Sequence, residues 1–300
     1  MELSWLSKIR IAIAIAIGVV LVGLLPWNMV KPSAGGVFAI LSGSISPSDL
    51  MVCGLLSFAA GFLASAVCTP FGSQIGILAV PAGLAAWSFR SADISTLFQA
   101  APAASSKLAV YSALRFEGFI WLALAFLGFF GALAADKLFR RKIPILHDKF
   151  DVGIKLHPFA AAGVAIVATV IVANFLLNIL AADISYADRK LGTVTGQPAN
   201  LQIAFGVLIA FMACGFSAKL FLGVNYVWPA LASAPLTVYS ISIYSKASVL
   251  EYLAGNWPSV FFARTAISVL PVQMVAFGCI GAVWGYWLAV SFRYWRQFES

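Results

Sequence analysis

Long runs of apolar residues, separated by short polar segments, dominate the pattern of this chain. A helix needs about 20 apolar residues in a row to cross the ~30 Å hydrocarbon core of a bilayer. The chain offers eight such runs, at Ile9–Leu25, Leu50–Cys68, Phe71–Phe89, Phe116–Ala135, Pro158–Ala182, Leu201–Ala218, Tyr226–Ile243 and Val269–Phe292. The pattern therefore predicts an all-α integral membrane protein with about eight transmembrane helices.

The seventh and first runs differ from typical membrane spans. The seventh run is the weakest, because it contains Pro229, Pro235 and several Ser and Thr residues. The first run follows Lys8 and Arg10, as the apolar part of a signal peptide would. It is long for such a segment, however, and no A-x-A cleavage site follows it before Lys31, so we expect an uncleaved first span.

Composition supports a membrane location. Hydrophobic residues make up 62% of the 300 positions and charged residues 10%, whereas soluble domains carry about 25% charged residues. The net charge is +8, but its basic residues lie in loops between apolar runs and form no stripe with interleaved aromatics. We therefore expect membrane lipids, other membrane subunits or further copies of the chain as partners, and no nucleic acid.

Basic loops set the expected orientation of the helices. More than half of the 19 Lys and Arg residues fall on the side of the membrane that holds the N-terminus. The densest group lies in one short loop between Lys137 and Lys155. Because short cytoplasmic loops carry an excess of basic residues, this side is expected to be cytoplasmic. Eight spans then place both termini in the cytoplasm, with the protein in a bacterial cytoplasmic (inner) membrane.

The two halves of the chain, residues 1–150 and 151–300, resemble each other. Gly61-Phe62 in the second run matches Gly215-Phe216 in the sixth, and Pro81 in the third run matches Pro229 in the seventh. Ser91–Gln99 and Ser245–Leu253 follow as matching short amphipathic segments. These matches favour two similar four-helix halves in parallel orientation, with the basic cytoplasmic loop in the first; chance similarity between apolar segments is the alternative.

Residue types that are typical of catalytic and metal-binding sites are scarce in this chain. Only two histidines exist, His147 and His157, and both flank the basic loop, so no histidine inside a span is available to ligate a haem. The chain has no H-E-x-x-H motif and no Gly-rich phosphate loop. The four cysteines fall within apolar runs, and we expect them to be buried as small hydrophobic residues. They are Cys53, Cys68, Cys214 and Cys279. We predict no catalytic residue, metal ligand or cofactor.

Amide side chains inside or beside the spans are the leading candidates for polar contacts within the membrane. They are Asn174, Asn178, Gln202, Gln273 and Gln74, and the first two lie four residues apart on one helix face. Interhelical hydrogen bonds, worth about 1 kcal/mol each, explain such residues, and a path for a polar substrate is the alternative.

Charged candidates are fewer. Glu117 lies one turn inside the fourth run near Arg115, and an interfacial pair reaching water is expected there, with a proton relay as the alternative. Arg140, Arg141 and Lys142 in the basic loop are candidate contacts for anionic lipid head groups.

Three classes of function follow. The first is a non-enzymatic structural or assembly subunit of a larger membrane complex, favoured by the small-residue faces and the scarcity of buried charge. The alternative is a transporter or channel for a neutral or lipidic substrate, favoured by the repeat and by the prolines within spans. An intramembrane enzyme is third, because the chain offers no histidine or carboxylate pair within the membrane.

Overall fold

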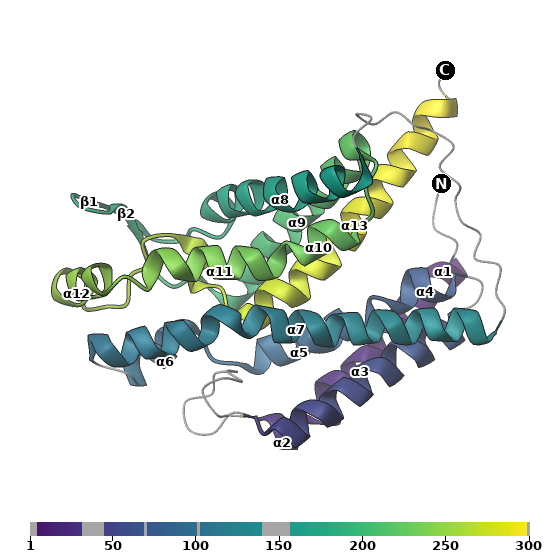
Figure 1. Ribbon diagram of the computed structural model, residues 1–300, viewed down its shortest axis with the longest axis horizontal. Helices are drawn as coiled ribbons and strands as arrows, with labels where there is room; N and C mark the ends of the chain where they lie inside the picture. The colour runs from purple at the N-terminus through teal and green to yellow at the C-terminus, as the bar shows by residue number, and fades with distance from the viewer. Residues whose placement is uncertain (1–4, 32–44, 69–70, 101–102, 140–156, 299–300) are drawn as a thin grey trace.

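The computed structural model describes residues 5–31, 45–68, 71–100, 103–139 and 157–298, and its long helices lie side by side in a bundle (Figure 1). Within this described part, seven helices are long and apolar enough to cross a membrane. They are Trp5–Leu24, Pro47–Val67, Gly72–Arg90, Ser105–Leu138, Pro158–Leu180, Asn200–Leu222 and Pro271–Arg296. The predicted class, an all-α membrane protein, agrees with this count.

Residues 1–150 are called the N-terminal half, and their described part contains seven α-helices. These are α1 (Trp5–Gly18), which continues as a π-helical stretch (Val19–Leu24), α2 (Trp27–Val30), α3 (Pro47–Val67), α4 (Gly72–Gly76), α5 (Ala79–Arg90), α6 (Ile94–Ala100) and α7 (Ala104–Leu138). The side chain of Ser46 caps α3 by accepting the backbone N–H of Asp49, and Pro47 fills the first helical position, where its missing N–H costs nothing.

Residues 151–300 form the C-terminal half. Its elements are α8 (Pro158–Leu180), a hairpin of β1 (Ser185–Asp188) and β2 (Gly192–Thr195), α9 (Asn200–Leu222), α10 (Val227–Leu231), α11 (Ser233–Tyr244), α12 (Ala247–Asn256), a 3-10 turn (Thr265–Ser268) and α13 (Pro271–Phe298). The two strands pair antiparallel, and the backbone of Thr195 also pairs with Phe262.

Each of the seven long helices overlaps one predicted span, and the predicted span Tyr226–Ile243 is the one outside the count. In the structure this segment forms α10 and α11, interrupted at Ala232. The fourth predicted span is longer than expected, because α7 continues on its N-terminal side through Ser105 to Arg115. The prediction followed apolar runs alone, so it did not include the polar residues of this N-terminal part of α7.

Helices α7 and α13 form the centre of the bundle. Helix α7 packs against α3 and α11, helix α13 packs against α9 and α5, and the two also contact each other. Both run in the same direction, towards the chain ends at the right of Figure 1. Following the predicted orientation, we call the end that holds their C-termini the inner end, and the end that holds α6, α12 and the hairpin the outer end.

Glycines allow the closest helix contacts. A Cβ atom on Gly61 of α3 would overlap the carbonyl oxygen of Gly128 on α7, and one on Gly215 of α9 would overlap that of Ala282 on α13. Small residues at a helix crossing let two backbones approach and gain dispersion contacts, the main attraction available between helices in lipid. These two crossings fix the α3–α7 and α9–α13 pairs.

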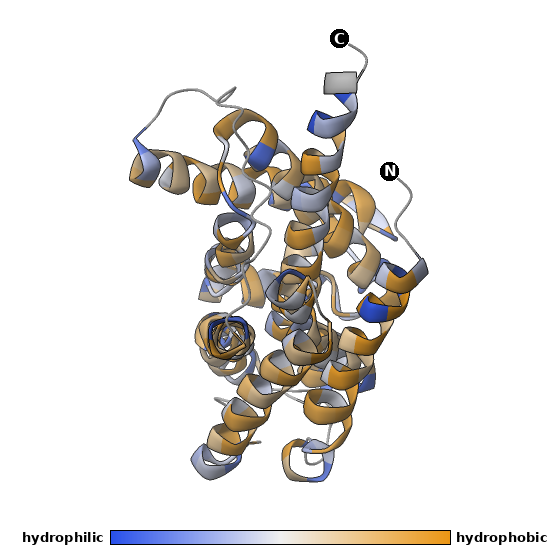
Figure 2. Ribbon diagram, turned by 90° about the vertical axis from the view of Figure 1, so that its right-hand side faces the viewer, coloured by the Kyte–Doolittle hydropathy of each residue, from blue (hydrophilic) through white to orange (hydrophobic). Residues whose placement is uncertain are grey.

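Many large apolar side chains are exposed, as the membrane class requires. Figure 2 shows the helix ribbons largely in orange and pale tones, with blue near several helix ends. On α8 alone, Phe159, Ile171 and Phe175 are more than half exposed. The four cysteines are free and buried, as predicted. Trp87 lies near a span end but is fully buried, its indole N–H bonded to the carbonyl of Gly23, so it is no interfacial anchor.

Glycine-to-alanine substitutions test the two crossings. Gly61→Ala and Gly215→Ala should each lower the free energy of unfolding by about 1–3 kcal/mol, because the added methyl group overlaps a backbone carbonyl. Gly163→Ala on α8, where a Cβ meets nothing within 4 Å, is the matched control and should raise stability by about 0.5–1 kcal/mol. Unfolding in mixed SDS micelles measures all three, and equal effects at Gly61 and Gly163 would contradict the close crossing.

Candidate functional site

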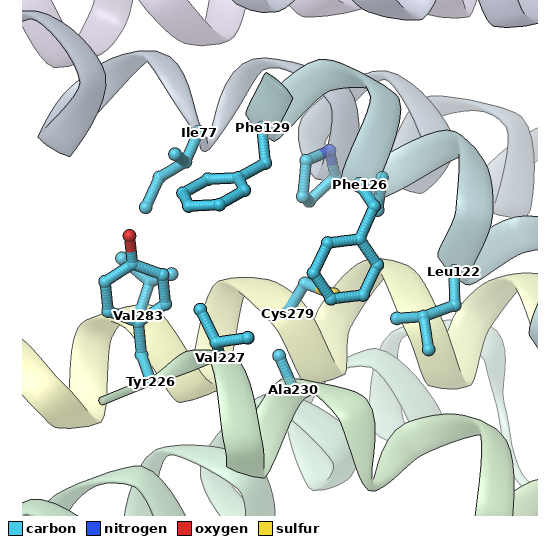
Figure 3. Close-up of a pocket in the computed structure, with 11 residues that line it drawn as sticks. Ile77, Leu122, Phe126, Phe129, Tyr226, Val227, Ala230, Cys279 and Val283 are labelled. Carbon is cyan, nitrogen blue, oxygen red and sulfur yellow. The ribbon is translucent and has the colours of Figure 1, made fainter. Parts of the chain in front are cut away.

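An apolar crevice lies between the N-terminal and C-terminal halves. The crevice is open on one side, and the space between its walls, about 420 Å³, includes the part that lies outside in the surroundings. Its walls are Ile77 and Pro81 of the α4–α5 segment, Leu122, Ala125, Phe126 and Phe129 of α7, Tyr226, Val227 and Ala230 at α10, and Cys279 and Val283 of α13. Figure 3 shows the two phenylalanine rings and the Tyr226 side chain around this space. The walls suit a hydrocarbon occupant and offer little to a polar one.

Two broken helices flank the crevice. Helix α4 ends before Ile77 and α5 begins two residues later, while α10 and α11 are separated at Ala232. Pro81 and Pro235 each occupy the third position of the following helix, and neither has an N–H to donate to the carbonyl four residues earlier. In a membrane, such breaks are tolerated where protein surrounds them or where they line a cavity.

Tyr226, Tyr286 and Lys219 lie next to one another at the inner end of the crevice, and Tyr226 forms part of its wall. The hydroxyl of Tyr226 points toward Ile77 (Figure 3). The ring of Tyr226 meets that of Tyr286 on α13 edge to face, with centroids 5.3 Å apart. The Lys219 ammonium of α9 lies 5.2 Å from the Tyr286 ring centroid, and Lys219 is only 7% exposed. Lys219 is therefore buried against aromatic rings close to the crevice.

In the N-terminal half, Asp136 fastens the inner turn between α3 and α4. Its carboxylate accepts the hydroxyl of Ser65 at 2.9 Å and the backbone N–H of Ser73 at 3.1 Å. A carboxylate in the last turn of α7 lies at the unfavourable end of that helix dipole. The hydrogen bonds offset this cost and hold the start of α4 against α7.

In the C-terminal half, Arg293 fastens the turn between α9 and α10. Its guanidinium donates to the carbonyls of Lys219 and Leu220, at 2.9 and 2.8 Å. Carbonyls in the last turn of a helix lack intrahelical partners, so a cation there is favourable. The backbone carbonyl of Lys219 thus takes part in holding this turn.

At the outer end, a chain of amide contacts links the two halves. The side chain of Asn200 hydrogen-bonds Asp93, which lies between α5 and α6. The amide of Gln273 donates to the side-chain oxygen of Asn200 at 3.0 Å and accepts the N–H of Leu270 at 3.0 Å. Burial raises the pKa of Asp93, and the Asn200 contact opposes this shift. These contacts join the α5–α6 connection to the start of α9 and to α13.

Two more of the predicted amides make backbone contacts between segments. Asn178 accepts the N–H of Thr265 at 3.1 Å, which joins α8 to the turn before α13. Gln202 donates to the carbonyl of Ala182 at 3.4 Å, across the connection from α8 to α9. Both contacts bind segments of the C-terminal half to each other, and neither residue lines the crevice.

The remaining predicted residues are spread through the bundle. Asn174 on α8 and Gln74 on α4 are half-buried. Glu117 on α7 is fully buried, so its carboxylate does not extend to the surface as the interfacial reading expected. Arg140, Arg141 and Lys142 lie outside the described residues. Sequence reasoning missed Asn200, Asp93 and Asp136, whose contacts depend on segments distant in the chain.

The β-hairpin at the outer end was not predicted either. Asp188 organises it, because one carboxylate oxygen accepts the N–H groups of Lys190 and Leu191, at 2.8 and 2.7 Å. The other oxygen accepts the hydroxyl of Tyr252 at 2.9 Å and the indole N–H of Trp257 at 3.0 Å. The strands Ser185–Asp188 and Gly192–Thr195 have four residues each, which is too short for a period-two pattern to stand out.

No known protein family, curated protein or solved structure compared with this chain matches it. Among the described residues, no group of three or more His, Cys, Asp or Glu side chains is placed to hold a metal ion. The long apolar helices alone define the class of this chain, which is a multi-pass membrane protein.

Protonation of Asp188 tests the hairpin. Desolvation disfavours its charge, but four hydrogen bonds outweigh that and lower the pKa from 3.8 to about 2. The contribution of the carboxylate is thus present above pH 3.8 and is lost as pH falls toward about 2. Hydrogen exchange in residues 185–195, corrected for intrinsic rates, should rise relative to the rest of the chain over that range.

Asp188→Asn gives the same test at neutral pH. Trypsin should cut after Arg189 and Lys190 several times faster in this variant, because the turn and its docking on Tyr252 and Trp257 are weakened. Asp183→Asn, at an exposed site just before the hairpin, is the control and should cut at the wild-type rate. Unchanged cleavage in Asp188→Asn would show that the hairpin does not depend on this carboxylate.

Proposed function

We propose that the chain consists of two similar four-span halves in parallel orientation. Residues 154 positions apart make corresponding contacts. Gly61 meets Gly128 and Gly215 meets Ala282, while Gly131 meets Phe58 and Gly285 meets Met212. The range of α5, Ala79–Arg90, is reproduced at the same spacing by α11, Ser233–Tyr244. Contacts between segments, rather than apolar similarity alone, support the repeat.

This spacing revises one match drawn from sequence. Pro81 corresponds to Pro235, since both are the third residue of the helix after a break, whereas Pro229 lies within α10. The α10–α11 segment is then the eighth span, in the place that α4–α5 takes in the N-terminal half. Its hydroxyls suit a membrane: Ser233 donates to Ala230 and Thr237 to Ser233, each to a backbone carbonyl of its own segment.

We infer that the protein binds, and moves or presents, a lipidic molecule in the crevice. The observation that carries this function is the apolar lining of a space between two broken helices, one from each half. Transporters built from repeats place their sites at the repeat interface and form them from discontinuous helices. An acyl or isoprenoid chain matches the narrow apolar walls, whereas a neutral polar solute would find few hydrogen-bonding groups there.

The assembly subunit, which is the first function expected from the sequence, becomes the second proposal, and it draws on the exposed apolar side chains of α8. It needs no occupant for the crevice, so occupancy separates the two functions. We propose that the protein catalyses no reaction. We also propose that it lies in the inner membrane with both termini in the cytoplasm.

Photo-crosslinking tests occupancy of the crevice. The protein is reconstituted with a lipid that carries a diazirine near the end of one acyl chain, and crosslinked peptides are located by mass spectrometry. Crosslinks should concentrate on the crevice faces of α7 and α10, including Phe126 and Val227. Ala125→Leu places a larger side chain in the crevice and should reduce these crosslinks about tenfold. A tenfold loss corresponds to an acyl chain that no longer buries two methylene groups, at ~0.8 kcal/mol each.

Ala123→Leu is the matched control, because Ala123 is exposed on the same helix and adds the same bulk outside the crevice. Its crosslinks should equal those of the wild type. Crosslinks confined to the outer surface of the bundle, or reduced equally by both substitutions, would contradict a lipid site. A fixed set of copurifying membrane subunits, together with an empty crevice, would instead support the assembly subunit.

A further inference from the structure

A second pocket lies at the outer end of the bundle, where α6 and α12 are found (Figure 1). Phe98 of α6 and Lys107 of α7 belong to the N-terminal half, and the rest of the wall comes from α11, α12 and the segment after α12. That part of the wall includes Tyr244, Leu250, Leu253, Trp257 and Phe261. We call this space the outer pocket; it measures about 290 Å³, including the part that lies outside in the surroundings.

One charged residue lines the outer pocket. Among the described residues of the wall, Lys107 is the only one with an ionised side chain, and no Asp or Glu belongs to the wall. Its ammonium lies 5.8 Å from the ring centroid of Phe98, which also lines the pocket. An ammonium is strongly hydrated and carries three N–H donors, which bind most strongly to an anionic acceptor. The pocket therefore favours an occupant with negative charge.

The other polar side chains of the wall already have partners within the protein. The Tyr244 hydroxyl donates to the carbonyl of Phe261 at 2.6 Å, and the Trp257 indole N–H donates to Asp188 at 3.0 Å. These two bonds hold the tyrosine and tryptophan rings in place. Apart from the ammonium, the side chains of the wall thus offer an occupant aromatic and aliphatic surface, which suits an apolar body.

The length of α7 places the outer pocket beyond the hydrocarbon core. The stretch of α7 from Lys107 to Lys137, an exposed lysine at the inner end, is about 45 Å long at helical rise. A bilayer measures ~30 Å across its hydrocarbon core and about 40–45 Å with both head-group layers. Acyl chains lie deeper than this pocket, and solutes from the outer aqueous phase come close to it. Leu122, the first α7 residue of the crevice, is about 22 Å away along the helix, so the two sites are separate.

We propose that the outer pocket binds a small organic acid with one carboxylate on an aromatic or short aliphatic body. The Lys107 ammonium receives the carboxylate, and the body lies among the rings of Phe98, Trp257 and Phe261. One cation balances one negative charge, which favours a monocarboxylate over a phosphate dianion. This site is additional to the crevice and does not depend on the lipid function proposed for it.

Photolabelling with two matched probes tests the site, with the intact chain in phosphatidylcholine nanodiscs. The probe para-azidobenzoate carries the charge, and para-azidobenzamide has the same ring without it. Labelling of α12 and residues 257–261 should favour the benzoate about tenfold, the ratio given by one hydrogen bond to a charged group. Lys107→Met should abolish this preference and leave the benzamide labelling in place, which also shows that the variant is folded. Lys107→Arg should retain the preference, because the charge remains.

Lys246→Met is the control for general attraction, since Lys246 is an exposed lysine just before α12 and does not line the pocket. It should keep the preference; a loss equal to that of Lys107→Met, or equal labelling of the wild type by both probes, would overturn the proposal. Ala254→Leu enlarges a side chain of the wall and should reduce labelling by both probes. Ala247→Leu, at an exposed position of the same helix outside the wall, should not, and equal reductions by the two variants would also contradict the site.

Competitors identify the source of the anion. Excess benzoate should displace the charged probe, whereas excess acetate, which lacks a comparable apolar body, should not. Phosphatidylglycerol added to the nanodiscs should leave the labelling unchanged. Displacement by acetate would show a site for any small anion, and displacement by phosphatidylglycerol would show a site for lipid head groups; either result would refute the proposal. Ala125→Leu in the crevice should leave this labelling unchanged, so failure of one site is distinguished from failure of the other.

Discussion

The two glycine crossings, α3 on α7 and α9 on α13, are the contacts on which the rest of the structure depends. In lipid, two helices gain little by burying apolar side chains against each other, so close backbone approach supplies much of the attraction. Gly61 and Gly215 permit that approach because any larger residue would meet a carbonyl. Each crossing makes a closely packed pair, and the α7–α13 contact joins the two pairs.

The crevice follows from this arrangement. With α7 and α13 held by their partners, the shorter segments α4–α5 and α10–α11 cover the sides, and each is broken ahead of a proline. Asp136 and Arg293 fix the inner turns that lead into these segments, one with a carboxylate and the other with a guanidinium.

The sequence was a good guide to the spans and a poor guide to the site. Apolar runs located the seven long helices because lipid demands continuous apolarity, and Pro158 began α8 where predicted. Gln273 was rightly singled out as a polar residue within a span. Its partner Asn200 was not, because nothing local marks a residue 73 positions away as its neighbour. The crevice is built mainly of ordinary apolar side chains, which carry no signal of their own.

Thiol labelling of residues 154 positions apart tests the parallel two-half architecture most directly. Ser105→Cys and Ser259→Cys are exposed positions at the outer end, and Lys137→Cys and Ser291→Cys are exposed positions at the inner end. The native cysteines are buried and provide the low background. In intact cells, a membrane-impermeant maleimide should label both outer positions, and it should reach both inner positions only after lysis. Opposite accessibility within either pair would contradict two parallel halves.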